Sequence, residues 1–491
     1  MLGSYLMIKE LSKKYVYLGF IPIGMYLVLL PALQYEANAI VGLYNTKRWG
    51  QLILFLFLAV VLLFSKPLKN ESSQLLAQIP FYARILLPIV LLIGIISSFQ
   101  SVHLEWALLE ISNLCLIFVL TFLVAAVCQR DIGFSAQAIK LIVLLAVGMY
   151  LLKFWTGYGL HIFGDYPLWG SDRTKMGLTG FASKRHFNHI QTWTLPILIS
   201  FIWMERKKAY RIALLLLTSC WGMLVIASAA RGTFAAIFIS LFVIAFQLKK
   251  ERHEFFKIVF QVIILSTFFY VVFFILLVDI DSESLVERFS EKGVGGRKEE
   301  WLSLLPGILA NPLLGYGPMH YSAVYLDNGW GHPHNWLLQF IYEWGIPIGV
   351  MMLGIFLHGI LSFSKTVFEK VSDYRDIYFW KFKVAIFWSI LASFLHAFIS
   401  GILVTPVSQV WFILIVGMGI ALHFKHANTE SINKFNKSIV IVLIFVAYSG
   451  FGFWTYNHGL NSNNYKESYI EYYDSTYFHP RFWQQGKIGF K

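Results

Sequence analysis

Charged residues are scarce in this sequence: Asp, Glu, Lys and Arg make up 14% of its 491 residues, while 57% of the chain is hydrophobic. Water-soluble domains carry about 25% charged and about 45–50% apolar residues, so this composition excludes an ordinary soluble enzyme. The sequence shows no internal repeat, no low-complexity tract and no separate soluble domain. We therefore expect an all-α polytopic integral membrane protein.

Cysteine is also scarce. Cys115, Cys128 and Cys220 each lie in or at the end of an apolar run, without a CxxC motif or a nearby pair of histidines. This pattern favours packing roles over a disulfide or a metal site.

Basic residues outnumber acidic ones, which gives a formal net charge of +13. A strongly basic chain can bind nucleic acid, but here the lysines and arginines lie in short loops between apolar runs, as they do when they set membrane topology. We therefore expect membrane lipids and no nucleic acid among its partners. The first apolar run, Tyr15 to Gln34, is too long for a cleavable signal peptide and is expected to remain as a signal anchor.

Apolar runs of roughly 20 residues, the length that crosses a bilayer as a helix, predict about 12–13 transmembrane helices. They lie at 15–34, 51–65, 82–99, 106–128, 136–155, 188–204, 211–229, 232–247, 256–278, 336–363, 384–401, 404–424 and 438–456.

We expect residues 1–456 to form the transmembrane domain. With a cytoplasmic N-terminus, the positive-inside rule places the long polar loops, at about 156–187 and 279–335, on the outer face. The aromatic-rich tail, 457–491, is expected to be periplasmic or interfacial, as a helix lying at the lipid headgroups.

Arg231 is the only charged residue between Ile212 and Leu248. A straight helix of roughly 36 residues would be near 54 Å long, almost two bilayer cores, so the chain must turn back. Ser228 and the Arg231–Gly232 pair are the natural turn, which places Arg231 at the outer end of a helical hairpin. It is either a snorkelling arginine or part of an anion site.

Two further basic groups precede helices on the same side. The stretch GFASKRHFNHIQTWTLP carries Arg185 and His186, and GVGGRKEEW carries Arg297 and Trp301 ahead of a surface helix predicted over 298–309. A guanidinium offers paired donors that suit phosphate oxygens, so Arg185 and Arg231 in one outer cavity would suit a diphosphate. Arg297 is either a helix cap or a third ligand.

The stretch from Gly315 to Gly349 concentrates polar residues at a membrane edge. His334 stands just before a helix that begins near Asn335, and a histidine there is either structural or able to take a proton from a hydroxyl. A zinc site that also uses His320 and His332 fits no familiar ligand spacing, so no metal is expected. Glu343, nine positions beyond His334, is expected to face away from it and to be structural.

The order of these motifs resembles the O-antigen ligase and O-antigen polymerase superfamily, which is related to the protein O-oligosaccharyltransferases. The resemblance rests on a hairpin arginine, a second arginine group, a Gly–Tyr–Gly motif, and a histidine separated by ten residues from a glycine: Arg231–Gly232, Arg297, Trp301, Pro312, Gly315–Tyr316–Gly317, His334–Asn335, Glu343 and Gly345. One departure is Ala235, which stands where the family has a leucine. The odd number of spans with an external tail differs from ligases that have both ends inside.

The resemblance implies a GT-C-like architecture in the bacterial inner membrane, with the active site facing the periplasm. It implies a metal-independent inverting glycosyltransferase without a cofactor, whose donor is a glycan on undecaprenyl diphosphate. By the same resemblance His334 would be the base, and Arg185, Arg231 and Arg297 would bind the diphosphate. The residues given possible supporting roles are Asn335, His186, His320 and Trp301.

The acceptor stays open at this point. A lipid A–core sugar would make the protein an O-antigen ligase, which we favour; a growing glycan would make it a polymerase, and a pilin serine a protein O-oligosaccharyltransferase. A transporter or flippase is the alternative outside the enzymes. It should show ionisable residues at the membrane midplane and an internal repeat, and neither is visible here.

Overall fold

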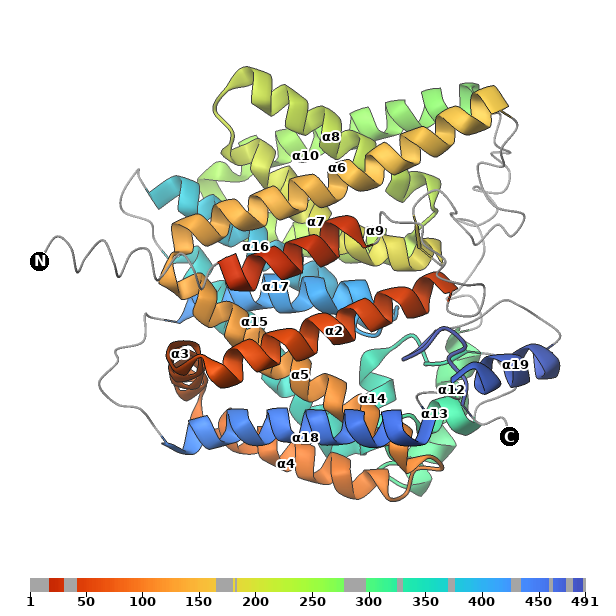
Figure 1. Ribbon diagram of the computed structural model, residues 1–491. Coiled ribbons are helices and arrows are strands. Elements are labelled where there is room, and N and C mark those ends of the chain that lie inside the picture. The colour runs from red at the N-terminus through yellow and green to blue at the C-terminus, as the bar shows by residue number, and fades with distance from the viewer. Residues whose placement is uncertain are drawn as a thin grey trace, which may run out of the picture.

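The computed structural model describes residues 17–30, 42–164, 180–181, 183–277, 297–324, 330–369, 376–424, 434–458, 462–473 and 480–488. Within these ranges every regular element is helical, and the long helices lie side by side with roughly parallel axes (Figure 1). Ten helices in the described part of the chain are long and apolar enough to cross a membrane. The expectation of an all-α polytopic membrane protein is confirmed.

These ten are α2 (Gly42–Phe64), α4 (Phe81–Ser98), α5 (Leu104–Arg130), α6 (Ile132–Gly164), α8 (Lys208–Ala227), α10 (Arg252–Tyr270) with its π-helical extension Val271–Leu276, α15 (Ile346–Phe368), α16 (Asp376–Ala397), α17 (Pro406–His423) and α18 (Lys434–His458). Two shorter apolar helices are Tyr17–Leu29 and α9 (Arg231–Gln247). The helix α7 (Lys184–Met204) is buried along almost its whole length, between α8 and α16. Each predicted apolar run has its counterpart among these helices.

The prediction of one continuous helix over residues 336–363 is wrong. It forms α14 (Trp336–Trp344) and α15, which are separated by Gly345. Gly345 has φ +89°, and a Cβ atom there would clash with the Leu313 carbonyl oxygen. The chain therefore breaks at a residue that needs both a left-handed backbone and room for a crossing segment of chain.

The predicted turn is present between α8 and α9, but α8 packs chiefly against α10 and α9 chiefly against α16. The turn occupies residues 228–230, and Ala229 takes up φ +49°. Arg231 is the first residue of α9, as the length of the apolar run required. The predicted surface helix also exists, as α12 (Arg297–Ala310).

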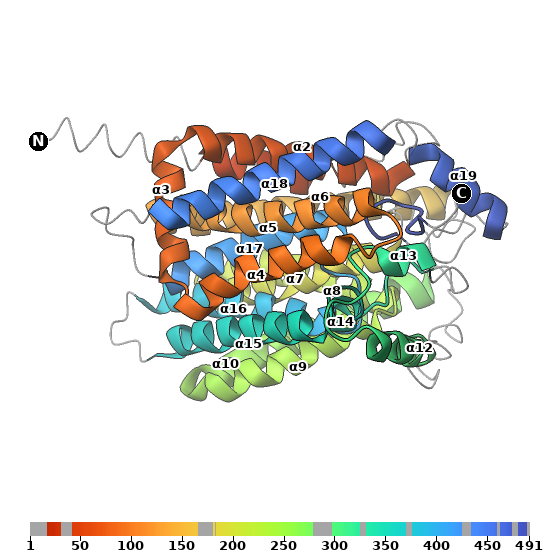
Figure 2. The same cartoon turned by 90° about the horizontal axis from the view of Figure 1, so that it is seen from below.

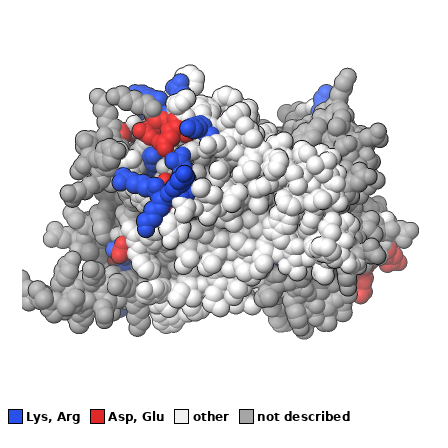
Figure 3. Space-filling view, turned by 90° about the horizontal axis from the view of Figure 1, so that it is seen from above, with Lys and Arg blue, Asp and Glu red and all other residues white. Residues whose placement is uncertain are grey.

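The polar elements gather at two ends of the bundle. We call the end that carries α12, α13 (His320–Val324) and α19 (Ser462–Tyr473) the loop end; it lies to the right in Figures 1 and 2. At the opposite end, α3 (Lys66–Gln78) lies across the ends of other helices (Figure 2). Seen from above, charged side chains gather at this opposite end, and the described middle of that face is uncharged (Figure 3).

The chain's last described residues differ from the expected surface tail. Arg481, Phe482, Trp483 and Lys487 are buried within the loop end rather than lying on a membrane surface. Two carboxylates of the helical body, Glu110 and Glu343, bind Arg481. Phe482 and Trp483 pack into an apolar cluster with Trp106 and Trp454.

Candidate active site

His334 lies at the loop end, directly before α14. Its backbone has φ +52°, a value that non-glycine residues adopt rarely, and its side chain is 9% exposed. The His334 N–H donates to His332 Nδ1 at 3.1 Å, and the two rings lie 4.3 Å apart. Asn335 caps α14, because its side-chain oxygen accepts the Leu338 N–H. These contacts fix His334 at the N-terminal end of α14.

Trp301, on α12, contacts the backbone of the segment that leads into His334. Its indole Nε1 donates a hydrogen bond to the Pro333 carbonyl oxygen, 2.8 Å away. Trp301 follows Arg297 by four residues, so the two side chains share one face of the helix. The helix that carries a predicted phosphate ligand therefore also holds the backbone next to His334.

Each of the three predicted arginines lies at the start of a helix. Arg185 is exposed in the first turn of α7, Arg231 opens α9, and Arg297 opens the described part of α12. Burial lowers the Arg297 pKa to about 10, helped by the charges of Arg185 and Arg231 and opposed by Glu300. Arg297 is therefore within electrostatic reach of both Arg185 and Arg231.

His189 lies between the arginines and the segment that precedes His334. It belongs to the polar entry of α7 but was not selected as a site residue from the sequence. Its Nδ1 lies 3.1 Å from Thr405 Oγ1, and its Nε2 lies 2.8 Å from Ser400 Oγ. His189 is also within electrostatic reach of both Arg185 and His332. The arginine group and the residues next to His334 therefore border the same part of α7.

Two glycines allow the elements around these histidines to approach closely. A Cβ atom at Gly401 would lie 2.5 Å from His332, so that ring rests on the connection between α16 and α17. A Cβ atom at Gly232 would lie 3.0 Å from His396 Nε2, which brings the start of α9 onto α16. His396, on α16, also lies 2.9 Å from Thr192 Oγ1 of α7. Nothing in the sequence marks His396 as a site residue, because it lies within an apolar run.

The two other predicted histidines have different surroundings. The His186 ring lies 6.1 Å from that of His189, so it borders the arginine region. His320 packs instead against Tyr316, with ring centroids 4.9 Å apart, and near Tyr342. Burial lowers the His320 pKa to about 4, so this ring is neutral at ordinary pH. Its contacts favour a packing role.

Glu300 is a buried ionisable residue that sequence analysis missed. It is 5% exposed on α12, and its Oε1 accepts a hydrogen bond from the Tyr321 hydroxyl. Burial raises its pKa to about 7, opposed by Tyr321, Lys487 and Arg297. Its neighbour in the sequence, Glu299, is exposed, so only the folded structure distinguishes the two.

Residues 212–354 match a family model described as O-antigen ligase. The matched stretch runs from α8 into α15 and includes Arg231, Arg297 and His334; Arg185 precedes it. No curated protein matches the chain. The match confirms the resemblance to the O-antigen ligase and polymerase superfamily.

Proposed function

We propose that this chain, a multi-pass membrane protein with an O-antigen ligase domain, transfers a glycan from an undecaprenyl-diphosphate carrier to an acceptor hydroxyl. The acceptor we propose is a lipid A–core sugar, which makes the protein an O-antigen ligase. The observation that carries this proposal is that the starts of α7 and α9 and the segment before His334 all pack against residues 396–405. His189 contacts Ser400 and Thr405, Gly232 lies against His396, and His332 lies against Gly401.

The positions of two arginines favour an anionic ligand. Arg185 and Arg231 lie in the first turns of α7 and α9, where the helix dipole is positive. A cation at a helix N-terminus is unfavourable by about 0.3–1 kcal/mol, whereas an anion is stabilised there. A bound diphosphate reverses this penalty and accepts hydrogen bonds from guanidinium groups and first-turn N–H groups.

The reaction that follows is an inverting displacement without a metal. A ring nitrogen of His334 accepts the proton of the acceptor hydroxyl while the hydroxyl oxygen forms a bond to the anomeric carbon of the donor. The bond between that carbon and the phosphate oxygen breaks, and its electron pair leaves with undecaprenyl diphosphate. Arg185, Arg231 and Arg297 stabilise the charge on this leaving group.

We propose that the loop end faces the periplasm of a bacterium, with the bundle in the inner membrane. Basic residues at the opposite end support this orientation: α8 has Lys207 at its N-cap and Lys208 as its first residue, and Lys249 and Arg252 begin the two helical segments after α9. The positive-inside rule assigns such short basic connections to the cytoplasm. Labelling of single cysteines with a membrane-impermeant reagent in intact cells tests this orientation.

The catalytic assignment is tested by His334→Asn in purified protein with a defined undecaprenyl-diphosphate glycan and a lipid A–core acceptor. Asparagine is the better replacement than alanine because it tolerates the left-handed backbone at φ +52°. We expect loss of transfer by at least about 100-fold, in line with general-base catalysis. His253→Asn, an exposed histidine in the first turn of α10, is the matched control. Substantial transfer by His334→Asn would reject the assignment.

The acceptor is tested in a deletion strain. Loss of lipopolysaccharide carrying the long glycan, with the glycan accumulating on its lipid carrier, is the result expected for a ligase. Shortened glycan chains would indicate a polymerase, and unglycosylated pilin would indicate a protein O-oligosaccharyltransferase; either result would reject the lipid A–core acceptor.

A further inference from the structure

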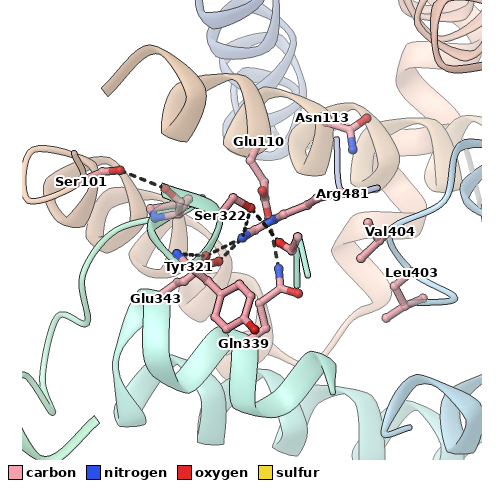
Figure 4. Close-up of polar contacts among 12 residues, drawn as sticks. Ser101, Glu110, Asn113, Tyr321, Ser322, Gln339, Glu343, Leu403, Val404 and Arg481 are labelled. Carbon is pink, nitrogen blue, oxygen red and sulfur yellow. Dashed lines mark hydrogen bonds and ion pairs between the residues drawn. The ribbon is translucent and has the colours of Figure 1, made fainter. Parts of the chain in front are cut away.

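The buried C-terminal segment, residues 480–488, contacts the helix that follows His334. Its Arg481 is 1% exposed and forms two hydrogen bonds with Glu343, Nη1 to Oε1 at 2.6 Å and Nη2 to Oε2 at 2.5 Å (Figure 4). Glu343 is fully buried in the last turn of α14. Arg481 Nη2 also donates to Glu110 Oε1 of α5, at 2.9 Å. One guanidinium therefore bridges two carboxylates from different helices.

The stability of this cluster of two carboxylates and one guanidinium depends on the positive charge of Arg481. Burying a carboxylate is costly unless a partner compensates its charge, and removing one member of a buried ion pair leaves the other uncompensated. Without Arg481, the buried Glu343 and the partly buried Glu110 would face each other without a cation. Glu343 would keep the Tyr321 N–H, 3.1 Å from its Oε1, and Glu110 would keep the Gln339 Nε2, 3.4 Å from its Oε1. Their repulsion would act directly on the C-terminal end of α14.

The backbone of the segment is anchored on α2, independently of α14. The Tyr44 hydroxyl donates to the Arg481 carbonyl oxygen at 2.6 Å, and Arg48 Nε donates to the Phe482 carbonyl oxygen at 2.8 Å. The Gln484 N–H donates to Asn45 Oδ1 at 2.7 Å. Arg481 is thereby held in place by a transmembrane helix that supplies none of the predicted site residues.

The same segment also reaches the N-terminal side of α14. Ser322 on α13 accepts a hydrogen bond from Arg481 Nη1 at 3.3 Å, and its hydroxyl donates to the Gly331 carbonyl oxygen at 2.7 Å. The Ile488 N–H donates to the Ser322 carbonyl oxygen at 3.1 Å. Gly331 stands three residues before His334. The segment therefore contacts both sides of the stretch 330–344 that contains His334.

We propose that Arg481 is a positioning residue of the glycan-transfer site, and that the C-terminal segment is a clamp which fixes His334 by holding α14 to α2 and α5. The role in transfer rests on the proposed function of His334. Arg481 itself touches neither substrate nor reacting atoms. It acts through Glu343 and Ser322.

The test compares Arg481→Met with Arg130→Met. Arg130 forms a similar two-bond pair with Glu71, at 2.8 and 2.7 Å, and lies at the opposite end of the bundle. We expect Arg481→Met to lower kcat by on the order of 10- to 100-fold per donor-binding site, with the donor KM little changed, because a small misplacement of a catalytic group has this effect. Arg130→Met should keep the wild-type kcat. The concentration of donor-binding sites is measured for each variant. Dividing the rate by this concentration distinguishes a slower chemical step from a smaller fraction of folded protein.

Hydrogen exchange of residues 330–344 provides a readout without catalysis. Exchange should become faster in Arg481→Met and stay unchanged in Arg130→Met. If Arg481→Met does not accumulate in membranes, Arg481→Lys gives the same comparison with a smaller effect, because lysine keeps one charge but cannot bind both carboxylates in a fork. Unchanged exchange and kcat in the Arg481 variants, or equal losses in Arg130→Met, would overturn the proposal. If wild-type protein transfers no glycan, the proposed function fails, and the exchange data alone decide whether the clamp exists.

Discussion

The Trp301 indole nitrogen and the Pro333 carbonyl oxygen form a hydrogen bond of 2.8 Å that joins α12 to the residue preceding His334. The bond explains why a tryptophan stands four residues after Arg297. It links the orientation of one phosphate-binding candidate to the position of the candidate base.

Replacing Trp301 by phenylalanine should therefore slow glycan transfer while leaving the protein folded. The ring is kept, and one hydrogen bond worth about 0.5–1.5 kcal/mol is lost, so we expect kcat to fall by about two- to tenfold with the donor KM unchanged. Trp380→Phe is a matched control, since Trp380 Nε1, near the start of α16, donates to the Val367 carbonyl oxygen of α15 at 2.9 Å. Trp380 packs against Trp203, at the end of α7 that is remote from Arg185. Steady-state kinetics of both variants make the measurement; equal rates for wild type and Trp301→Phe would show that the bond does not position His334.

Arg231→Lys should fail nearly as completely as Arg231→Ala. Lysine keeps the charge but offers a point donor in place of the planar fork that matches a diphosphate. Affinity for the undecaprenyl-diphosphate glycan, measured by direct binding, should fall in both variants. Arg252→Lys, at the start of α10, is the control and should bind normally. Equal donor affinity in wild type and both Arg231 variants would remove Arg231 from the proposed site.

Transfer should persist in excess chelator. The positive charge that stabilises the leaving diphosphate comes, in our proposal, from three guanidinium groups, and these need no metal to act. The measurement is the initial rate after dialysis against EDTA, with and without added Mg²⁺. A rate that collapses and recovers with the cation would assign part of this stabilisation to a metal ion instead.

Much of the fold could be predicted because bilayer thickness constrains the chain strongly. The length of the apolar run required a turn, and Ser228 with the Arg231–Gly232 pair indicated where it lies. The amphipathic pattern of residues 298–309 predicted the surface helix α12. The break at Gly345 was missed, although Pro347 two residues later was a local signal. What forces the break is the approach of the Leu313 carbonyl, a contact between distant parts of the chain that periodicity does not report.

The candidate site stays a prediction from local patterns. Arginines beside apolar runs and a histidine at a helix start are local patterns. The clamp is different, since Arg481 and Glu110 are separated by 371 residues. An acid within an apolar run signals that some partner must exist, but sequence cannot name a partner so far away.

Glu300 provides a prediction about pH and stability. Its pKa in the folded protein is about 7, raised chiefly by burial from an ordinary value near 4.5. Between these two values the folded protein keeps the proton and the unfolded chain releases it, so the stability should fall as pH rises from about 4.5 to 7 and level off above that. The full change is on the order of 3 kcal/mol.

Glu300→Gln should remove this pH dependence of stability, measured by thermal unfolding in detergent at several pH values, because the amide carries no proton to lose. Glu299→Gln, which changes an exposed residue, should keep the pH dependence. A wild-type slope in Glu300→Gln would mean that another group carries the pH dependence, and that the carboxyl on α12 is already ionised beside Tyr321 and Lys487.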